Sequence, residues 1–225
     1  MRLDEIAANV AGVRARVAAA CERAGRDPAS VTLIAVTKSY PAADVLAAHA
    51  AGIADVGENR VQEGLAKRVE ADVSRLRWHL IGHLQTNKAR LAVDHFDVLH
   101  GIDSARALTA VDDAADRAGR VAPVFLEVNV AGEASKDGIP VEALAALVAH
   151  ARSLAHIRVE GLMTVAPHAP DPEQVRPVFV ELRRLAASHG LESLSMGMTG
   201  DFEAAIEAGA THIRVGRAIF GERVA

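Results

Sequence analysis

Lys38 directly follows the apolar run 31–37 and is separated by only two residues from Pro41, which is typical of the first turn of a helix. A lysine ammonium that is poorly solvated loses its proton more readily, and the neutral amine attacks carbonyl carbons. A lysine at the end of a buried strand can therefore hold an aldehyde as a Schiff base. The alternative is a lysine that packs its stem along the strand end and keeps its ammonium in water.

A second group of polar and small residues lies near the end of the chain. Thr199 and a following glycine stand between a strand-like run and a helical pattern at 202–207. The next run ends at 214–217, where Gly216 allows close backbone approach and Arg217 adds positive charge. Free backbone N–H groups at such helix starts attract anions, which predicts a phosphate site. The alternative is that the glycines only make turns and that Thr199 only caps a helix.

Apolar, strand-like runs alternate with helical patterns along the whole chain, after a first helix at about residues 3–24. Strands that alternate with helices must pair in parallel, and eight such units are typical of a closed barrel. We therefore predict an α/β fold, a single-domain (β/α)8 TIM barrel over residues 1–225, with an open doubly wound sheet as the alternative. The predicted strands span Val31–Lys38, Ala54–Asn59, Arg77–Gly82, Asp97–Asp103, Pro123–Val130, Ile157–Val165, Ser193–Thr199 and His212–Gly216.

Composition excludes several classes of protein. The formal net charge is −4, and no segment concentrates the positive charge that nucleic-acid binding requires. Cys21 is the only cysteine, so an intramolecular disulfide is impossible. No apolar run reaches the roughly 18 residues that a membrane span needs, and we expect a soluble, cytoplasmic protein. A closed barrel has no open sheet edge, so we expect a monomer.

In a barrel of this type the C-terminal ends of the strands meet at one mouth, where active sites lie. That rule brings Lys38 together with Asn59, Thr199 and the segment 214–217. A lysine that binds an aldehyde, placed beside a phosphate site, suits a phosphorylated aldehyde. The residues leave two classes open, a sugar phosphate and pyridoxal 5′-phosphate (PLP).

Several motifs, taken in order, resemble the pyridoxal phosphate homeostasis proteins, a family of single-domain barrels related to the N-terminal domain of alanine racemases. The resemblance implies that Lys38 carries PLP as a Schiff base and that Arg214 approaches the pyridine nitrogen. It also implies that Thr199, Gly216 and Arg217 hold the phosphate, and Asn59 and Ser195 complete the predicted cofactor-binding set. The motifs are Ala35–Lys38, Gly57–Glu63, Trp78–Lys88, Gly161–Met163, Ser195–Thr199 and Arg214–Gly221.

The chain departs from the family pattern at two of these positions. Thr199 stands where family members usually have Ser, and Arg217 stands where they commonly have Thr or Ser. Threonine keeps the hydroxyl, so the first change is mild. The backbone N–H of Arg217 can still bind phosphate, whether its side chain contacts the phosphate or points to solvent.

Two features favour a carrier over an enzyme. A cation at the pyridine nitrogen disfavours ring protonation and so weakens the electron sink that stabilises carbanions. Racemisation also needs an acid or base on each face of the substrate, and the related racemases take one, a tyrosine, from a second domain. Tyr40, the only tyrosine here, is expected to line the cofactor pocket instead.

We therefore predict a PLP-binding protein that buffers the cofactor and delivers it to PLP-dependent apoenzymes. It has no assigned catalytic residue and no robust activity of its own. Two alternatives of different kinds remain open: a PLP-dependent amino-acid racemase, and a Schiff-base aldolase that acts on a sugar phosphate.

Four further residues have chemistry that the prediction does not use. His79 and His83 have a spacing seen in zinc sites, but they span a strand end and lack an evident third ligand, so no metal is predicted. Glu58 is either a base or the partner of a neighbouring cation. Lys136 lies in a polar loop and either faces the pocket mouth or remains solvated.

Overall fold

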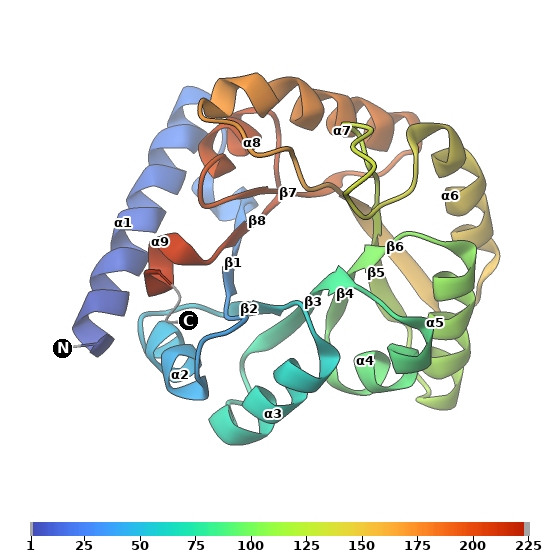
Figure 1. Cartoon of the computed structure of the whole chain (residues 1–225), viewed down its shortest axis with the longest axis horizontal. Helices are drawn as coiled ribbons and strands as arrows, with labels where there is room; N and C mark the ends of the chain where they lie inside the picture. The colour runs from blue at the N-terminus through green and yellow to red at the C-terminus, as the bar shows by residue number, and fades with distance from the viewer. Residues whose placement is uncertain (1, 223–225) are drawn as a thin grey trace.

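Eight parallel strands close into a barrel in sequential order, and the last strand, β8, pairs with the first, β1 (Figure 1). This computed structural model describes residues 2–222, so residues 1 and 223–225 of the predicted domain lie outside it. The predicted single-domain (β/α)8 barrel is confirmed, and the open doubly wound sheet is excluded by the β1–β8 pairing.

The strands are β1 (Thr32–Val36), β2 (Asp55–Glu58), β3 (Arg77–His83), β4 (Val98–Ile102), β5 (Ala122–Glu127), β6 (Ile157–Met163), β7 (Ser193–Met198) and β8 (His212–Val215). The helices are α1 (Arg2–Arg23), α2 (Ala42–Ala50), α3 (Val61–Ala71), α4 (Ala89–His95), α5 (Ala105–Arg117), α6 (Leu144–Ser153), α7 (Arg176–Ser188), α8 (Phe202–Glu207) and α9 (Arg217–Phe220). All predicted strands are present. All but β3 end one to three residues earlier than predicted, because the residues that follow them belong to the loops of the mouth.

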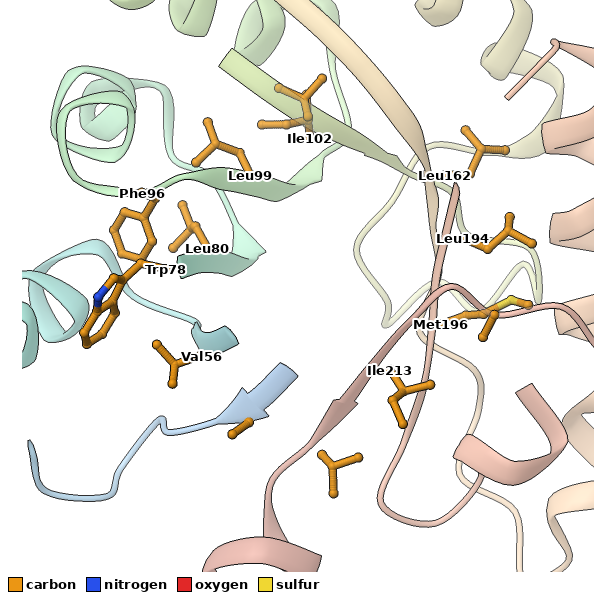
Figure 2. Packing of buried hydrophobic residues seen from close by; sticks show 14 of the residues in the cluster. Val56, Trp78, Leu80, Phe96, Leu99, Ile102, Leu162, Leu194, Met196 and Ile213 are labelled. Carbon is orange, nitrogen blue, oxygen red and sulfur yellow. The ribbon is translucent and has the colours of Figure 1, made fainter. Parts of the chain in front are cut away.

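The largest hydrophobic cluster lies between the strands and the surrounding helices, and Figure 2 shows part of it, including Trp78, Leu80 and Ile213. Small side chains let the helices approach the strands closely, as expected for a core built mainly from Ala, Val, Leu and Ile. The predicted extra N-terminal helix, α1, buries Ile6, Val10 and four more residues at intervals of three, four or one along one face. It contacts α2, α8 and α9 and so covers the closing strand pair (Figure 1).

The barrel interior differs from the Val, Ile and Leu layers that usually fill this fold. A small apolar cluster contains Val98, Phe125 and Met163. The ring of His100 stacks on Phe125 at a centroid distance of 4.4 Å, and His212 contacts the same phenyl ring edge-on. The centre of the barrel therefore holds polar rings, which need hydrogen-bond partners inside the protein.

The backbone on both sides of Lys38 is held by the ammonium of Lys67 on α3. Lys67 Nζ donates to the carbonyl of Thr37 at 2.5 Å, and to one carboxylate oxygen each of Glu58 and Glu63 at 2.7 Å. The same Glu63 oxygen accepts the N–H of Ser39, which has a φ of 66° in the left-handed region. A serine pays strain there, so these contacts hold the turn after Lys38 in place.

The two carboxylates of this network differ in their electrostatics. Burial raises the pKa of Glu58, and the hydrogen bonds from Lys67 and Thr37 oppose that rise without cancelling it. Burial acts on Glu63 in the same direction, but hydrogen bonds from Lys67 and Ser39 outweigh it and lower the pKa. Lys67 is thus the cation that compensates both groups.

None of the helices within residues 2–222 has the length and apolar character needed to cross a membrane.

Replacing Lys67 with methionine should lower the free energy of unfolding by about 3–5 kcal/mol, because it leaves the buried Glu58 and the half-buried Glu63 without their cation. Urea unfolding of wild type and Lys67→Met measures the difference. Arg90→Met is the matched control, because the Arg90 side chain is 81% exposed and lies 3.7 Å from Asp94, a surface pair worth less than about 1 kcal/mol. Equal losses in the two variants would contradict the role assigned to Lys67.

Candidate functional site

The C-terminal ends of the strands surround a cavity of about 680 Å³. Its walls come from the ends of β1, β2, β3, β6, β7 and β8 and from the loops that follow β5 and β6. Six of the seven predicted site residues line it, and the structure thereby brings together Lys38, Asn59, Thr199, Arg214, Gly216 and Arg217.

Lys38 enters the cavity from the end of β1 and is half-buried. Apolar side chains of Val36, Ile81 and Met163 line the same wall. An amine at this position can meet an aldehyde that enters the cavity. The side chain of Lys38 is therefore in a place that suits reversible carbonyl chemistry.

Backbone N–H groups face the cavity where β7 and β8 end. Within residues 2–222, the N–H groups of Thr199, Gly200 and Gly216 have no hydrogen-bond acceptor. The turn before them is tightly packed: Gly197 has a φ of 93°, and a Cβ on it would lie 2.6 Å from the Cβ of Ala205. Unpaired N–H groups in such a turn form the kind of site that binds phosphate.

Arg214 is a buried cation on the cavity wall, with a relative exposure of 4%. Its Nη1 donates to Ser195 Oγ at 2.7 Å, and its Nη2 donates to the carbonyl of Thr164 at 2.9 Å. Burial lowers its pKa to about 10, against the opposing charges of Glu127 and Asp201. Arg214 thus remains charged at neutral pH, although no carboxylate within residues 2–222 contacts it directly.

Two residues lie elsewhere than the sequence suggests. Ser195 is fully buried behind Arg214 and does not line the cavity, so its hydroxyl supports the guanidinium. Tyr40 also does not line the cavity, because its ring packs on Phe220 and its hydroxyl donates to the carbonyl of Gly221 at 2.6 Å. The expectation that Tyr40 lines the cofactor pocket is therefore wrong.

The side chain of Arg217 is 57% exposed, and its Nη1 lies 3.9 Å from a carboxylate oxygen of Glu222. This long contact on the surface restrains the guanidinium weakly. The backbone of Arg217 opens α9 at the cavity wall. The residue can thus offer its N–H to an anion in the cavity whichever way its side chain turns.

The structure shows where four residues lie whose roles the sequence left open. Glu58 is the buried partner of Lys67, and Lys136 lines the cavity. His79 is fully buried inside the barrel, whereas His83 is exposed and lies 3.0 Å from Asp103. Across residues 2–222, no group of three or more His, Cys, Asp or Glu side chains is arranged to hold a metal ion.

These groups match what a phosphorylated pyridine aldehyde requires. Lys38 could supply an amine for the aldehyde, and the N–H groups near Thr199 and Gly216 could supply donors for the phosphate. Arg214 could supply a donor for an unprotonated ring nitrogen. All three types of group open onto the same cavity, so the residues fit the group that the sequence implies.

Glu127, at the end of β5, is a buried carboxyl near the site that the sequence did not single out. Burial raises its pKa from the ordinary 4.5 to about 7, and the charge of Arg214 acts against this rise. The predicted strand ran on to Val130, which hid Glu127 inside it, whereas β5 ends at Glu127 itself. A polar residue within a predicted buried run was the available signal.

The difference in stability between wild type and the Glu127→Gln variant should depend on pH, and the variant should gain relative to wild type as pH rises. A raised pKa in the folded state means that the folded protein holds the proton more tightly, so this stability is lost as pH rises through about 7. The free energy of unfolding of wild type relative to Glu127→Gln should fall by about 2–3 kcal/mol between roughly pH 4.5 and pH 8. Urea unfolding at several pH values measures it, with the exposed Glu22→Gln as control. A pH-independent difference would show that the carboxyl is not perturbed.

Comparison with known proteins places the chain in a family. The model of the alanine racemase N-terminal domain matches residues 2–224. A pyridoxal phosphate homeostasis protein of Pseudomonas aeruginosa is 43% identical, over 98% of this chain and 97% of its own length. One from Escherichia coli is 42% identical, over 98% of each chain.

Solved structures agree with these sequence matches. PipY of Synechococcus elongatus, in a structure with PLP bound, is 38% identical and superposes with a TM-score of 0.85, over 96% of this chain and all of PipY. An alanine racemase of Clostridium difficile shares the fold at 14% identity and a TM-score of 0.75, and this chain spans 57% of it. The chain belongs to the alanine racemase N-terminal domain family and, within it, to the pyridoxal phosphate homeostasis proteins.

Proposed function

We propose that this protein binds pyridoxal 5′-phosphate as a Schiff base on Lys38, buffers the cofactor in the cytoplasm, and delivers it to PLP-dependent apoenzymes. The observation that carries the proposal is the convergence of an amine, a buried cation and unpaired N–H groups on one cavity. The relatives named for PLP homeostasis, and PipY with PLP bound, support the choice of ligand.

Each predicted residue has a role in this proposal. Thr199, Gly216 and Arg217 bind the phosphate, with the Thr199 hydroxyl adding one donor to the backbone N–H groups. Arg214 donates to the pyridine nitrogen. Asn59 lines the wall between β2 and β3, and Ser195 acts through Arg214.

A holding role fits the residues better than turnover does. When bound, PLP exchanges reversibly between amines and can act as an electron sink. Arg214 keeps a positive charge beside the ring and so opposes protonation of its nitrogen, which limits that sink. Tyr40 faces Phe220 and leaves no tyrosine in the cavity for the second proton transfer of a racemase.

The rim of the cavity suits exchange with solvent. Gly200, His168 and Glu222 on the rim are exposed. Ligand can therefore enter and leave without movement of the barrel strands. We propose a monomer as the working form, because the barrel closes its own sheet.

Incubation with PLP should produce a new absorbance band, and borohydride followed by peptide mass mapping should place a pyridoxyl adduct on Lys38. The adduct should be absent from Lys38→Ala. Lys136→Ala is the matched control, because Lys136 lines the same cavity, and it should keep the adduct on Lys38. An adduct that maps to Lys136 in wild type, or no adduct, would contradict a Schiff base on Lys38. Turnover of amino acids would favour the racemase alternative.

The phosphate contacts are tested by comparing PLP with pyridoxal, which lacks the phosphate. Thr199→Ala removes a hydroxyl donor to a charged group, so it should weaken PLP binding by about tenfold. Binding of pyridoxal should change little. Fluorescence or absorbance titration measures both affinities, and an equal loss for the two ligands would contradict a phosphate role for Thr199.

A further inference from the structure

A continuous chain of hydrogen bonds runs through the barrel from the cavity wall to the opposite end. Arg214 Nη1 contacts Ser195 Oγ at 2.7 Å, and Ser195 Oγ contacts His100 Nδ1 at 2.8 Å. His100 Nε2 lies 2.9 Å from His79 Nδ1, and His79 Nε2 lies 2.9 Å from Asp55 Oδ1. The four links join strands β8, β7, β4, β3 and β2.

The chemistry of the two ends gives this chain a direction. A guanidinium only donates hydrogen bonds and a carboxylate only accepts them. His79 therefore donates from Nε2 to Asp55, and in its neutral form its Nδ1 must accept from His100 Nε2. His100 then accepts at Nδ1 from the hydroxyl of Ser195.

The opposite direction fails at Ser195. If His100 donated from Nδ1, the serine oxygen would accept from both His100 and Arg214. The hydroxyl proton of Ser195 would then have no acceptor within residues 2–222, in a side chain that is fully buried. An unmet buried donor is costly. Burial also lowers the pKa of His100 well below its usual value, which agrees with a neutral ring.

We propose that Asp55, His79, His100 and Ser195 are positioning residues that fix the guanidinium of Arg214 on the cavity wall through a one-directional hydrogen-bond chain. The inference rests on the proposed PLP site, because Arg214 is the group that faces the ring. Each link polarises the next, so the carboxylate at one end of the barrel strengthens the acceptor that Arg214 uses at the other. Among residues 2–222, the other direct partner of Arg214 is a neutral carbonyl, that of Thr164.

Asp55 lies far enough along the chain to separate this role from direct contact with a ligand. It does not line the cavity, its side chain is 14% exposed, and it also lies 3.6 Å from Arg77 Nη1. Any effect of Asp55 on the cavity must therefore pass through the buried residues between them.

The first test needs no substitution and no cofactor. Two-bond ¹H–¹⁵N correlation spectra of the wild-type protein report which ring nitrogen of each histidine carries the proton. His79 and His100 should both be neutral, with the proton on Nε2. A proton on Nδ1 of either ring would overturn the proposed direction.

The second test compares two buried or nearly buried histidines that both contact the ring of His100. His79→Phe breaks the chain, whereas His212→Phe alters a ring that contacts Phe125 and His100 but is outside the chain. PLP affinity should fall by about tenfold in His79→Phe, with a shifted absorbance maximum of the bound cofactor, and change less than about twofold in His212→Phe. Asp55→Asn should show a smaller loss in the same direction, and it decides the matter if His79→Phe does not fold.

The outcomes separate this inference from the proposed function. If wild type binds no PLP, the proposed function fails, while the tautomers still report on the chain. If wild type binds PLP and neither His79→Phe nor Asp55→Asn differs from His212→Phe in affinity or spectrum, the positioning role is wrong and the proposed function stands.

Discussion

Closure of the sheet between β1 and β8 is the constraint on which the cavity depends. The register of this pair places Ile34 opposite Arg214 and Ala35 opposite Val215. Lys38 and the loop at Gly216 therefore leave the barrel side by side, although they are 178 positions apart in the sequence. In an open sheet with these two strands apart, the amine of Lys38 and the backbone N–H of Gly216 would not share one cavity. Helix α1, which covers this seam, thus supports the site without touching it.

Two internal networks hold the parts of the cavity wall that carry Lys38 and Arg214. Lys67 fixes the backbone on each side of Lys38, and the serine and histidine chain holds Arg214. Both place a cation among neutral acceptors or carboxylates inside the protein, where an unpaired charge would be costly. The cavity walls are therefore held by electrostatics as well as by packing.

Sequence patterns were sufficient to predict the strands and most of the cavity residues at their ends. The alternation of apolar runs with helical patterns predicts parallel strands and favours a barrel over an open sheet, and the rule that strand ends share one mouth then gathers Lys38, Asn59 and Thr199. The networks could not be predicted in this way. Ser195 and His100 are 95 residues apart, and their contact depends on which face of each strand points inward. Ser195 was accordingly expected at the ligand, and Tyr40 was assigned by its closeness to Lys38 in sequence instead of in space.

The buried guanidinium of Arg214 explains why polar side chains replace the usual aliphatic layers inside this barrel. A buried guanidinium at the mouth end needs acceptors below it, and an aliphatic layer would supply none. Ser195 accepts from Arg214, and its own hydroxyl then needs an acceptor, which His100 supplies. His100 and His79 each need an acceptor in turn, and the last acceptor is Asp55, near the opposite rim. His212 and Phe125 then fill the remaining volume with rings that pack against His100. The charge required at the cavity thus determines which residues the centre of the barrel can contain.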